Sequence, residues 1–415
     1  MAETSRRSIR FENRQARIVE AACAEINLNG AGATTLEAVA GRIGLDQSSV
    51  SYYFDGKDEL VAACVERTLR WTLDCALKAS FAPGAERRLR SFISAQFSDF
   101  AKARLTGATP LARMSNVRSL GCAGRASIEV LRDEVVRAVR DLLDFGSDMA
   151  SASMRAHQLL SIMDWVPAWI DDYEVRDFGR VEARLVDVVE RGIGSSDSWD
   201  ADVRAIAGLQ DRTARDRFTT AAATVINRQG YRGASVERIA AELGVSTGSF
   251  YHHFEHKDEL VAACFDRHCE LLERAHAQPE ASGGDEGAGL VATVASLVAC
   301  QFGSEPRLLR LEGHRELPSP MRTKMECKIS RETARLAGRI ADAVAGGSFR
   351  AVDPMITARV VEALIDGAAD VRHLMGGRSP EVCAAAYLDP LRTGLLAQPR
   401  CTAQTASQRI LASSA

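Results

Sequence analysis

The chain has 415 residues, a length that allows roughly two to four domains. Its composition (46% apolar, 26% charged, 6% aromatic) excludes a collagen-like or wholly disordered protein. Its net charge of −3 gives no bulk attraction to nucleic acid or to acidic membranes, so any contact with DNA has to be local. The sequence contains neither an apolar run of about 18 residues nor the apolar stretch of a secretory signal. We therefore expect a cytoplasmic protein with no membrane partner.

The sequence repeats itself at an interval of 200 residues. Residues 57–64 and residues 257–264 both read KDELVAAC, and the match extends outward without a gap. Further identical positions, each recurring 200 residues later, are Arg17, Ala21, Ala22, Ile26, Asn27, Gly30, Glu37, Ala40, Gly44, Ser49, Phe54 and Arg67. The repeat predicts two copies of one unit, each roughly 200 residues long.

Each copy begins with a dense helical pattern. Apolar residues over 18–26 have helical spacing and predict a first helix that runs up to Gly30. Thr34 and Glu37 have the spacing of a capping box, so a second helix is expected to begin at Thr34. Gly44 is expected to end that helix after roughly ten residues.

The third predicted helix of each copy is short. In the first copy it covers about residues 47–54, with Asp46 as its cap, and a longer fourth helix begins at Lys57. In the second copy Ser235 starts the second helix and Ser246 caps the third, before the repeated lysine begins the fourth.

Two short helices joined by a glycine-containing turn form a helix-turn-helix, whose second helix can lie in the major groove of DNA. The third helices suit this role because their exposed hydroxyl, amide, imidazole and phenol groups can contact phosphates or read base edges. These side chains are Gln47, Ser48, Ser49, Ser51, Tyr52 and Tyr53 in the first copy, and Thr247, Ser249, Tyr251, His252 and His253 in the second. Gly248 allows close approach of the backbone to a phosphate, and Lys57 and Lys257 add positive charge at the start of the fourth helices.

Neither segment is basic as a whole. Residues 1–60 carry seven Lys and Arg against nine Asp and Glu, and residues 201–260 carry eight against eight. The one local concentration of positive charge is Arg6, Arg7, Arg10, Arg14 and Arg17. It is either an arm that contacts phosphates or the minor groove, or a solvated polar terminus.

The run from Gly244 to Lys257, GVSTGSFYHHFEHK, resembles the signature of TetR/AcrR-family transcriptional regulators. The shared features are a glycine turn, a serine, a small residue with glycine, an apolar residue before tyrosine, and the lysine. The resemblance is specific over residues 14–69 and 214–269 and weaker elsewhere. It implies an all-α fold, in which a three-helix DNA-binding domain precedes a helical domain that dimerises and encloses an effector pocket.

The resemblance also implies roles for individual residues. It places phosphate contacts at Thr35, Ser51 and Lys57, and at Ser235, Tyr251 and Lys257. It places base contacts at Gln47, Ser48, Ser49 and Tyr52, and at Thr247, Gly248, Ser249 and His252. The first copy departs from the signature at Ser48, where glycine is usual, and at Ser51, where tyrosine is usual. The second copy is therefore predicted to be the better DNA reader.

We accordingly expect two tandem TetR-like modules. Their predicted boundaries are 10–60 for the first DNA-binding domain, 61–193 for the first effector and dimerisation domain, 194–210 for a linker, 211–260 for the second DNA-binding domain, 261–398 for the second effector and dimerisation domain, and 399–415 for a disordered tail.

The predicted function is that of a sequence-specific DNA-binding transcriptional regulator, a ligand-responsive repressor with a double-stranded DNA operator as partner. Two assemblies stay open: a pseudo-dimer within one chain that reads unlike half-sites, and a homodimer of tandem chains. The alternative function is a TetR-fold interaction protein with only one functional DNA-binding module. The sequence lacks a nucleophile elbow, a P-loop, a dinucleotide fingerprint and a zinc-protease motif, so we expect neither an enzyme nor a cofactor.

A candidate effector site lies in residues 159–173, where Trp165 and Trp169 are one helical turn apart and Pro167 bends the helix. The segment resembles the late effector-domain helix of family members that sense acyl or steroid-derived thioesters. The candidate pocket residues are Trp165, Trp169, Phe97 and Met114. An ordinary core or subunit interface is the alternative. The corresponding residues 363–371 contain no tryptophan, so either the pockets of the two copies differ or one of them is absent.

The ten cysteines form no C-x-x-C pair, and most lie in apolar helical surroundings, which favours reduced, buried thiols. Cys264 and His268 are four residues apart, near three further histidines, and this grouping suggests a zinc site. However, Cys64 repeats Cys264 without any partner histidine, which favours a packing role. We therefore expect no metal.

Overall fold

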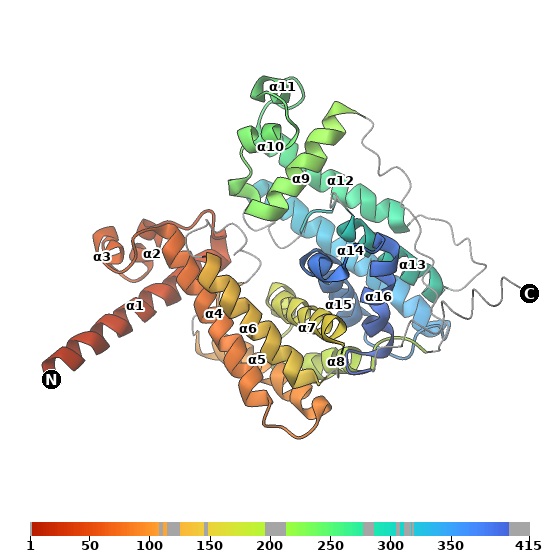
Figure 1. Ribbon diagram of the computed structural model, residues 1–415, viewed down its shortest axis with the longest axis horizontal. Coiled ribbons are helices and arrows are strands. Elements are labelled where there is room, and N and C mark those ends of the chain that lie inside the picture. The colour runs from red at the N-terminus through yellow and green to blue at the C-terminus, as the bar shows by residue number, and fades with distance from the viewer. Residues whose placement is uncertain are drawn as a thin grey trace, which may run out of the picture.

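The computed structural model describes residues 2–107, 111–113, 125–144, 148–195, 213–276, 286–303, 308–310, 317 and 319–397. Within these ranges the chain is helical, and one isolated bridge joins Gly194 to Phe349 (Figure 1). The expected all-α fold of two tandem modules is confirmed. Met114 and the predicted tail at 399–415 lie outside the described residues, as does most of the predicted linker.

The two modules have the same order of helices. The first contains α1 (Ala2–Asn29), α2 (Leu36–Arg42), α3 (Gln47–Ser51), α4 (Lys57–Ala79), α5 (Ala85–Thr106), α6 (Arg125–Leu143), α7 (Met149–Trp169), the 3-10 helices η3 (Ile170–Asp172) and η4 (Val175–Asp177), and α8 (Phe178–Arg191). The second contains α9 (Ala214–Gly233), α10 (Val236–Glu242), α11 (Thr247–Tyr251), α12 (Lys257–His276), α13 (Glu286–Phe302), α14 (Ser319–Ala345), α15 (Pro354–Gly367), the 3-10 helix η6 (Ala368–Met375) and α16 (Pro380–Thr393).

The start of α2 differs from the prediction. The hydroxyl of Thr35, not that of Thr34, accepts the capping hydrogen bond from the backbone N–H of Ala38. Thr34 instead donates its hydroxyl to the carbonyl of Gly30, which it reaches because the chain turns directly after α1. The prediction of a capping box between Thr34 and Glu37 is therefore wrong. Ser235 does cap α10, as predicted.

The turns before α3 and α11 depend on their glycines. Gly44 and Gly244 both have φ of 65°, in the left-handed region that favours glycine. Ser246 caps α11 by accepting from the N–H of Ser249, whereas Asp46 precedes α3 without such a bond. The third helices are shorter than expected: they end at Ser51 and Tyr251, and the next residues, Tyr52 and His252, close them with helical φ and ψ.

The first helices of the two modules differ at their N-termini. α9 begins behind Thr213, which forms a reciprocal capping box with Asp216. α1 continues about three turns further in the N-terminal direction than α9 does and projects away from the rest of the molecule (Figure 1). The exposed side chains of Arg10, Arg14 and Arg17 follow this helix.

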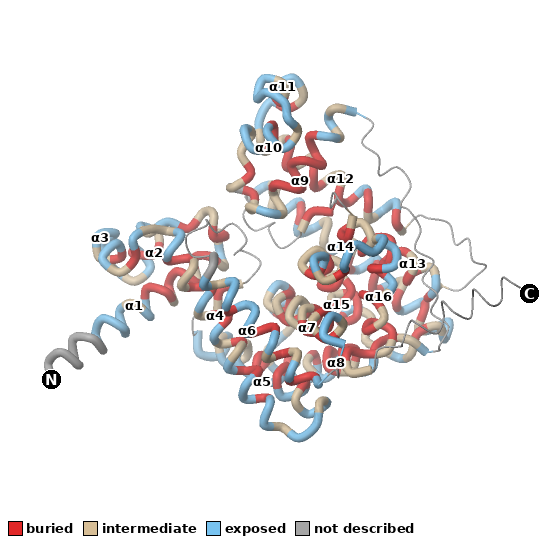
Figure 2. The backbone as a smooth tube through the Cα atoms, viewed as in Figure 1, coloured by how far each residue is buried: buried red, intermediate tan, exposed pale blue. Residues whose placement is uncertain are grey.

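The described apolar side chains form one large cluster and two main smaller ones. Each smaller cluster fills a DNA-binding domain of the predicted kind, built on α1–α4 or on α9–α12. The large cluster joins the remaining helices of both modules into one body, in which α7 packs on α15 and α8 packs on α15 and α16. Buried residues accordingly run through the centre of the molecule in Figure 2, while α3 and α11 lie at separate outer corners.

Backbone contacts between the modules are reciprocal. The N–H of Ile193 donates to the carbonyl of Leu391 (2.9 Å), and the N–H of Leu395 donates to the carbonyl of Val189 (2.8 Å). These residues occupy equivalent places, at and just after the ends of α8 and α16. Such exchange of equivalent contacts is the mark of a twofold interface. The two modules are therefore related here by an approximate twofold axis.

Two glycines permit this close approach. Gly192 and Gly394 have φ of 63° and 92°, and each lies directly on the backbone of the other module. A Cβ atom at Gly192 would overlap the carbonyl of Arg392, and one at Gly394 would overlap the carbonyl of Glu190. We call this pair of crossings, made by residues 189–195 and 391–395, the glycine crossing.

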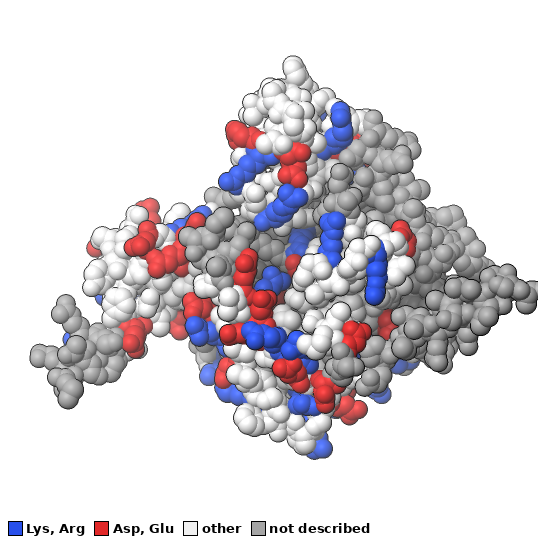
Figure 3. Space-filling view, in the orientation of Figure 1, with Lys and Arg blue, Asp and Glu red and all other residues white. Residues whose placement is uncertain are grey.

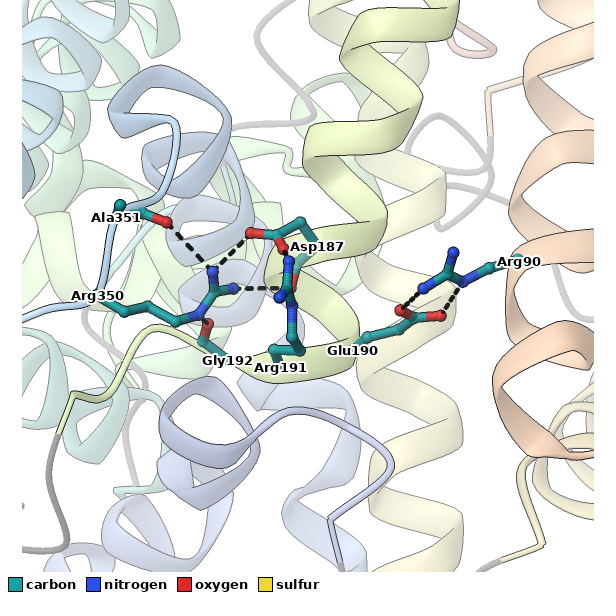
Figure 4. A network of polar contacts seen from close by, with 7 residues as sticks. All are labelled: Arg90, Asp187, Glu190, Arg191, Gly192, Arg350 and Ala351. Carbon is teal, nitrogen blue, oxygen red and sulfur yellow. Dashed lines mark hydrogen bonds and ion pairs between the residues drawn. The ribbon is translucent and has the colours of Figure 1, made fainter.

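Arginine side chains support the glycine crossing (Figure 4). Arg350, between α14 and α15, donates to the carboxylate of Asp187 (2.7 Å) and to the carbonyls of Asp187 (2.8 Å) and Gly192 (2.7 Å). Arg90 on α5 forms a two-pronged ion pair with Glu190, at 2.7 and 2.6 Å. Arg350 therefore joins the modules, and Arg90 holds α8 against its own module.

Candidate nucleic-acid interface and internal cavities

α3 and α11 each bury one apolar side chain and leave the others exposed or half-buried. Val50 and Phe250 are fully buried and attach their helices to the domain cores, whereas Tyr52 and Tyr251 are 72% and 59% exposed. A helix of this size held by one anchor presents most of its side chains outward. This arrangement leaves both helices accessible to a DNA groove.

Every predicted DNA-contacting residue reaches the surface. Those classed as exposed are Thr35, Gln47, Ser48, Ser51, Tyr52, Thr247, Gly248, Tyr251 and His252. Those that are half-buried are Ser49, Tyr53, Lys57, Ser235, Ser249, His253 and Lys257. Their contacts with DNA stay a prediction.

The two surfaces differ in their aromatic contacts. In the first module the ring of Phe11 on the extended α1 lies 4.7 Å from that of Tyr53 and 6.1 Å from that of Tyr52, measured between ring centroids. In the second module Tyr251 packs edge-on against its buried neighbour Phe250, at 5.1 Å. The two tyrosines that follow α3 thus contact α1, whereas Tyr251 extends from α11 into solvent.

The repeated lysines contact their own domains. Lys57 donates to the carbonyl of Gly32 (3.1 Å), and the ammonium group of Lys257 lies 4.1 Å from the centre of the Tyr231 ring. Lys57 therefore stabilises the turn between α1 and α2, and Lys257 stabilises the C-terminal end of α9. Acidic and basic side chains are mixed on the face of the molecule seen in Figure 3, in line with the balanced charge of both segments.

An asparagine in each module ties the DNA-binding domain to the helical domain. Asn27 on α1 donates to the carbonyl of Leu111 and accepts from the N–H of Arg113, both at 2.8 Å. Asn227 on α9 makes the same two bonds to the backbone of residues 308–310, at 2.8 and 2.9 Å. Only the repetition of this asparagine signalled its role, which the sequence interpretation had missed.

The tie continues into the helices that join the modules. Arg310 pairs with Asp370 of η6, which follows α15, through contacts of 2.8 and 3.3 Å. Arg113 pairs with Asp171 of η3, which follows α7, at 3.8 Å. We call each chain of contacts, from the asparagine through the arginine to the aspartate, an asparagine tie. Both ties link a DNA-binding domain to a helix at the module interface.

Two cavities lie beside the asparagine ties. A cavity of about 450 Å³ in the first module is lined by Asn27, Arg113 and Asp171 among others. A smaller cavity of about 60 Å³ in the second module is lined by Leu308, whose carbonyl accepts from Asn227, and by its neighbour Leu309, among others. The residues that line the two cavities differ, as expected for two unlike pockets.

The predicted effector residues are dispersed. Trp165 lines the small cavity of the second module, although it belongs to α7 of the first. Trp169 and Phe97 are buried in the large shared core and line neither of these two cavities. Met114 lies outside the described residues. Their roles in effector binding stay a prediction.

The histidine and cysteine of α12 are packed inside the second module. The thiol of Cys264 donates to the carbonyl of Thr219 (3.4 Å), and burial raises the pKa of this thiol to about 12. Burial also lowers the pKa of His268 to about 4, so that its ring is neutral near pH 7. Among the described residues no group of three potential ligands is arranged to hold a metal ion. None of the described helices is both long and apolar enough to cross a membrane.

One family model matches the chain twice, once in each DNA-binding domain. Residues 18–64 and residues 218–264 both match the family model described as "Bacterial regulatory proteins, tetR family". The two matched segments contain α3 and α11 in full, together with the turns before them. The match thus covers the surfaces described above.

Two curated relatives are similar over part of the chain. The HTH-type transcriptional regulator BetI of Burkholderia thailandensis is 33% identical over 90 residues, which are 21% of this chain and 46% of that protein. The HTH-type transcriptional repressor DrrR1 of Streptomyces coeruleorubidus is 28% identical over 122 residues, which are 29% of this chain and 44% of that protein. The chain therefore spans about half the length of the curated relatives it matches.

Solved structures are similar over a single module's length. The crystal structure of AibR in complex with isovaleryl coenzyme A and operator DNA matches with 20% identity and a TM-score of 0.37, over 43% of this chain and 98% of that chain. The TetR family transcriptional regulator PfmR from Thermus thermophilus matches with 24% identity and a TM-score of 0.35, over 43% and 98%.

Proposed function

The chain belongs to the TetR family and carries the family's DNA-binding segment twice, and from this premise we propose that it is a sequence-specific DNA-binding transcriptional regulator. The observation that carries the proposal is the exposure of α3 and α11, each held by one buried apolar residue inside a matched segment. The hydroxyl, amide and imidazole groups on these helices supply the donors and acceptors that base edges and phosphates require. The matched family is one of regulatory proteins and not of enzymes.

The protein acts, in this proposal, as a pseudo-dimer within one chain. Support comes from the glycine crossing, where equivalent backbone groups of the two modules bond each other reciprocally. A symmetric pair of subunits normally presents two equal recognition helices to a palindromic operator. Here α3 and α11 differ in sequence, as QSSVS against TGSFY, so the operator should have two unlike half-sites.

The proposal also includes repression that responds to a small-molecule ligand. A ligand can change DNA binding only if it binds two conformations of the protein unequally. The asparagine ties support such coupling, since each joins the backbone beside a cavity to the first helix of a DNA-binding domain. A ligand that displaced residues 308–310 would therefore shift α9 and, with it, α11.

The test is a footprint of the purified full chain on operator DNA selected from a random pool, at several salt concentrations. Replacing Tyr251 and Lys257 by alanine should weaken specific binding by roughly ten- to a hundredfold, because a phosphate contact and an exposed aromatic ring are lost. The matched pair, Ser51→Ala with Lys57→Ala, should weaken it less, because serine reaches less far.

Thermal melting of each variant separates loss of contact from loss of fold. Protection that survives all four substitutions in a folded protein would contradict the assigned surface. Equal affinity for every DNA sequence would leave only electrostatic binding.

A protein with one functional DNA-binding module is the second candidate function. The contacts of Phe11 with Tyr52 and Tyr53 favour it, because they engage tyrosines that a base-reading α3 would need. In this case the Ser51 and Lys57 variants should bind the selected DNA as the unaltered chain does, and the footprint should cover a single half-site.

A further inference from the structure

The cavity of the second module is built by both modules. Its walls come from α12, α13, α14 and α15, and Trp165 reaches it from α7 across the module interface. The indole of Trp165 lies against the carboxyl group of Glu362, whose pKa is raised by burial. Most of the remaining wall is apolar, including Leu272, Val294, Leu297, Leu309, Ile329 and Leu336. The enclosed space therefore favours a compact apolar occupant.

Two buried polar side chains in this wall have hydrogen-bonding atoms without partners in the described part of the chain. His268 is 4% exposed, and neither nitrogen of its ring has a partner there. Gln301 is 1% exposed, and its side-chain oxygen accepts no bond there. A buried polar atom left unpaired is unfavourable, so a ligand that paired with these atoms would gain affinity.

The charged groups that line the cavity all have one sign. Glu332, Glu362 and Asp366 contribute carboxyl groups, while no lysine or arginine belongs to the lining among the described residues. One carboxyl oxygen of Glu332 is buried without a partner in those same residues, and burial raises the pKa of this group. Three arginines stand behind the lining: Arg335 pairs with the other oxygen of Glu332 at 3.7 Å, Arg359 with Glu362, and Arg339 with His276. The lining itself therefore offers hydrogen-bond acceptors and acidic groups, to which a cation can donate.

The first module lacks this arrangement at the equivalent position. Thr68 stands where the second copy has His268, and its hydroxyl donates to the carbonyls of Cys64 (3.1 Å) and Ala112 (3.2 Å). The first module thus pairs its polar group internally. The second module leaves an acceptor facing the cavity, next to Leu308 and Leu309 of the segment that Asn227 holds.

We propose that this cavity is a binding site for a compact apolar amine. The protonated amine donates to His268, Gln301 and Glu332, and the hydrocarbon part lies against the leucine-rich wall. An anion would meet the acidic groups of Glu332, Glu362 and Asp366 and find no lysine or arginine in the lining, so a carboxylate of the same shape is rejected. This inference deepens the ligand response of the proposed function and rests on that function only for the effect of the amine on DNA.

The test is calorimetric titration of the full chain with three probes of one shape: isobutylamine, isobutanol and isobutyrate. Isobutylamine is expected to bind at least tenfold more tightly than isobutyrate, with isobutanol between them. Equal or tighter binding of isobutyrate, or no measurable binding of the amine, would overturn the proposal.

Variants locate the amine. Glu332→Gln keeps the shape and removes the charge, and should reduce the preference for amine over alcohol to less than threefold. His268→Thr installs the residue of the first module and should weaken amine binding about tenfold. Glu270→Gln, on the exposed side of α12, is the matched control and should change nothing. Amine binding that Glu332→Gln leaves intact in a folded protein would place the amine elsewhere and refute the assignment.

Titration in the presence of the selected operator separates the two proposals. Amine binding without specific DNA binding would leave the cavity site standing and refute the regulator. Specific DNA binding without amine binding would do the reverse.

Discussion

Gly394→Ala is expected to lower the free energy of unfolding by about 3–5 kcal/mol. Gly394 has φ of 92° and ψ of 155°, a region open almost only to glycine, and a Cβ atom there would overlap the carbonyl of Glu190. The added methyl group must therefore both strain the backbone and push the modules apart. Urea unfolding followed by circular dichroism measures the change, as a lower midpoint.

Gly376→Ala is the matched control for this substitution. Gly376 also has positive φ, at 61°, but a Cβ atom there would have no neighbour within 4 Å among the described atoms. We expect it to cost only roughly 1 kcal/mol, the conformational part of the effect. If the two variants lower the free energy of unfolding equally, the glycine crossing contributes little to the stability of the contact between the modules.

The same variant tests the spacing of the two DNA-binding domains. If the glycine crossing sets the distance between α3 and α11, Gly394→Ala should weaken binding to an operator with both half-sites. Binding to either half-site alone should change little, because each DNA-binding domain has its own core.

Asn227→Ala is expected to release residues 308–310 from α9. The substitution removes two hydrogen bonds of 2.8 and 2.9 Å and should lower the free energy of unfolding by roughly 1–3 kcal/mol. Hydrogen–deuterium exchange gives the specific readout, because the N–H of Arg310 donates directly to Asn227. We expect the exchange of this amide to accelerate strongly in the variant.

The control lies in the other copy of the repeat. Asn27→Ala should accelerate exchange at the N–H of Arg113, which donates to Asn27 at 2.8 Å, and leave that of Arg310 unchanged. Operator DNA bound to α11 should alter exchange in η6 of the unaltered chain but not of the Asn227 variant. Undiminished protection of Arg310 in Asn227→Ala would mean that the asparagine does not hold this segment.

Most helices of the DNA-binding domains could be predicted from local patterns. The starts of α4 and α12 at Lys57 and Lys257 and the cap of α10 at Ser235 depend on neighbouring residues alone. The cap at Thr35 was misassigned by one residue because Thr34 is drawn to the carbonyl of Gly30. Two adjacent threonines each carry a hydroxyl that could cap α2, and only the path of the preceding turn decides which one does so.

The sequence alone predicts the duplication, the helical class and the outward face of α3 and α11. Identity at a fixed interval and the spacing of apolar residues reveal these features without any knowledge of distant contacts. Only the tertiary structure decided three further features. These are the pairing of the modules, the entry of Trp165 into the other module's cavity, and the hydrogen bonds by which Asn27 and Asn227 hold the helical domains. These contacts join side chains or backbone groups that are 80 or more residues apart. Several of them end on carbonyl oxygens, which every residue carries and which no residue type therefore marks in a sequence.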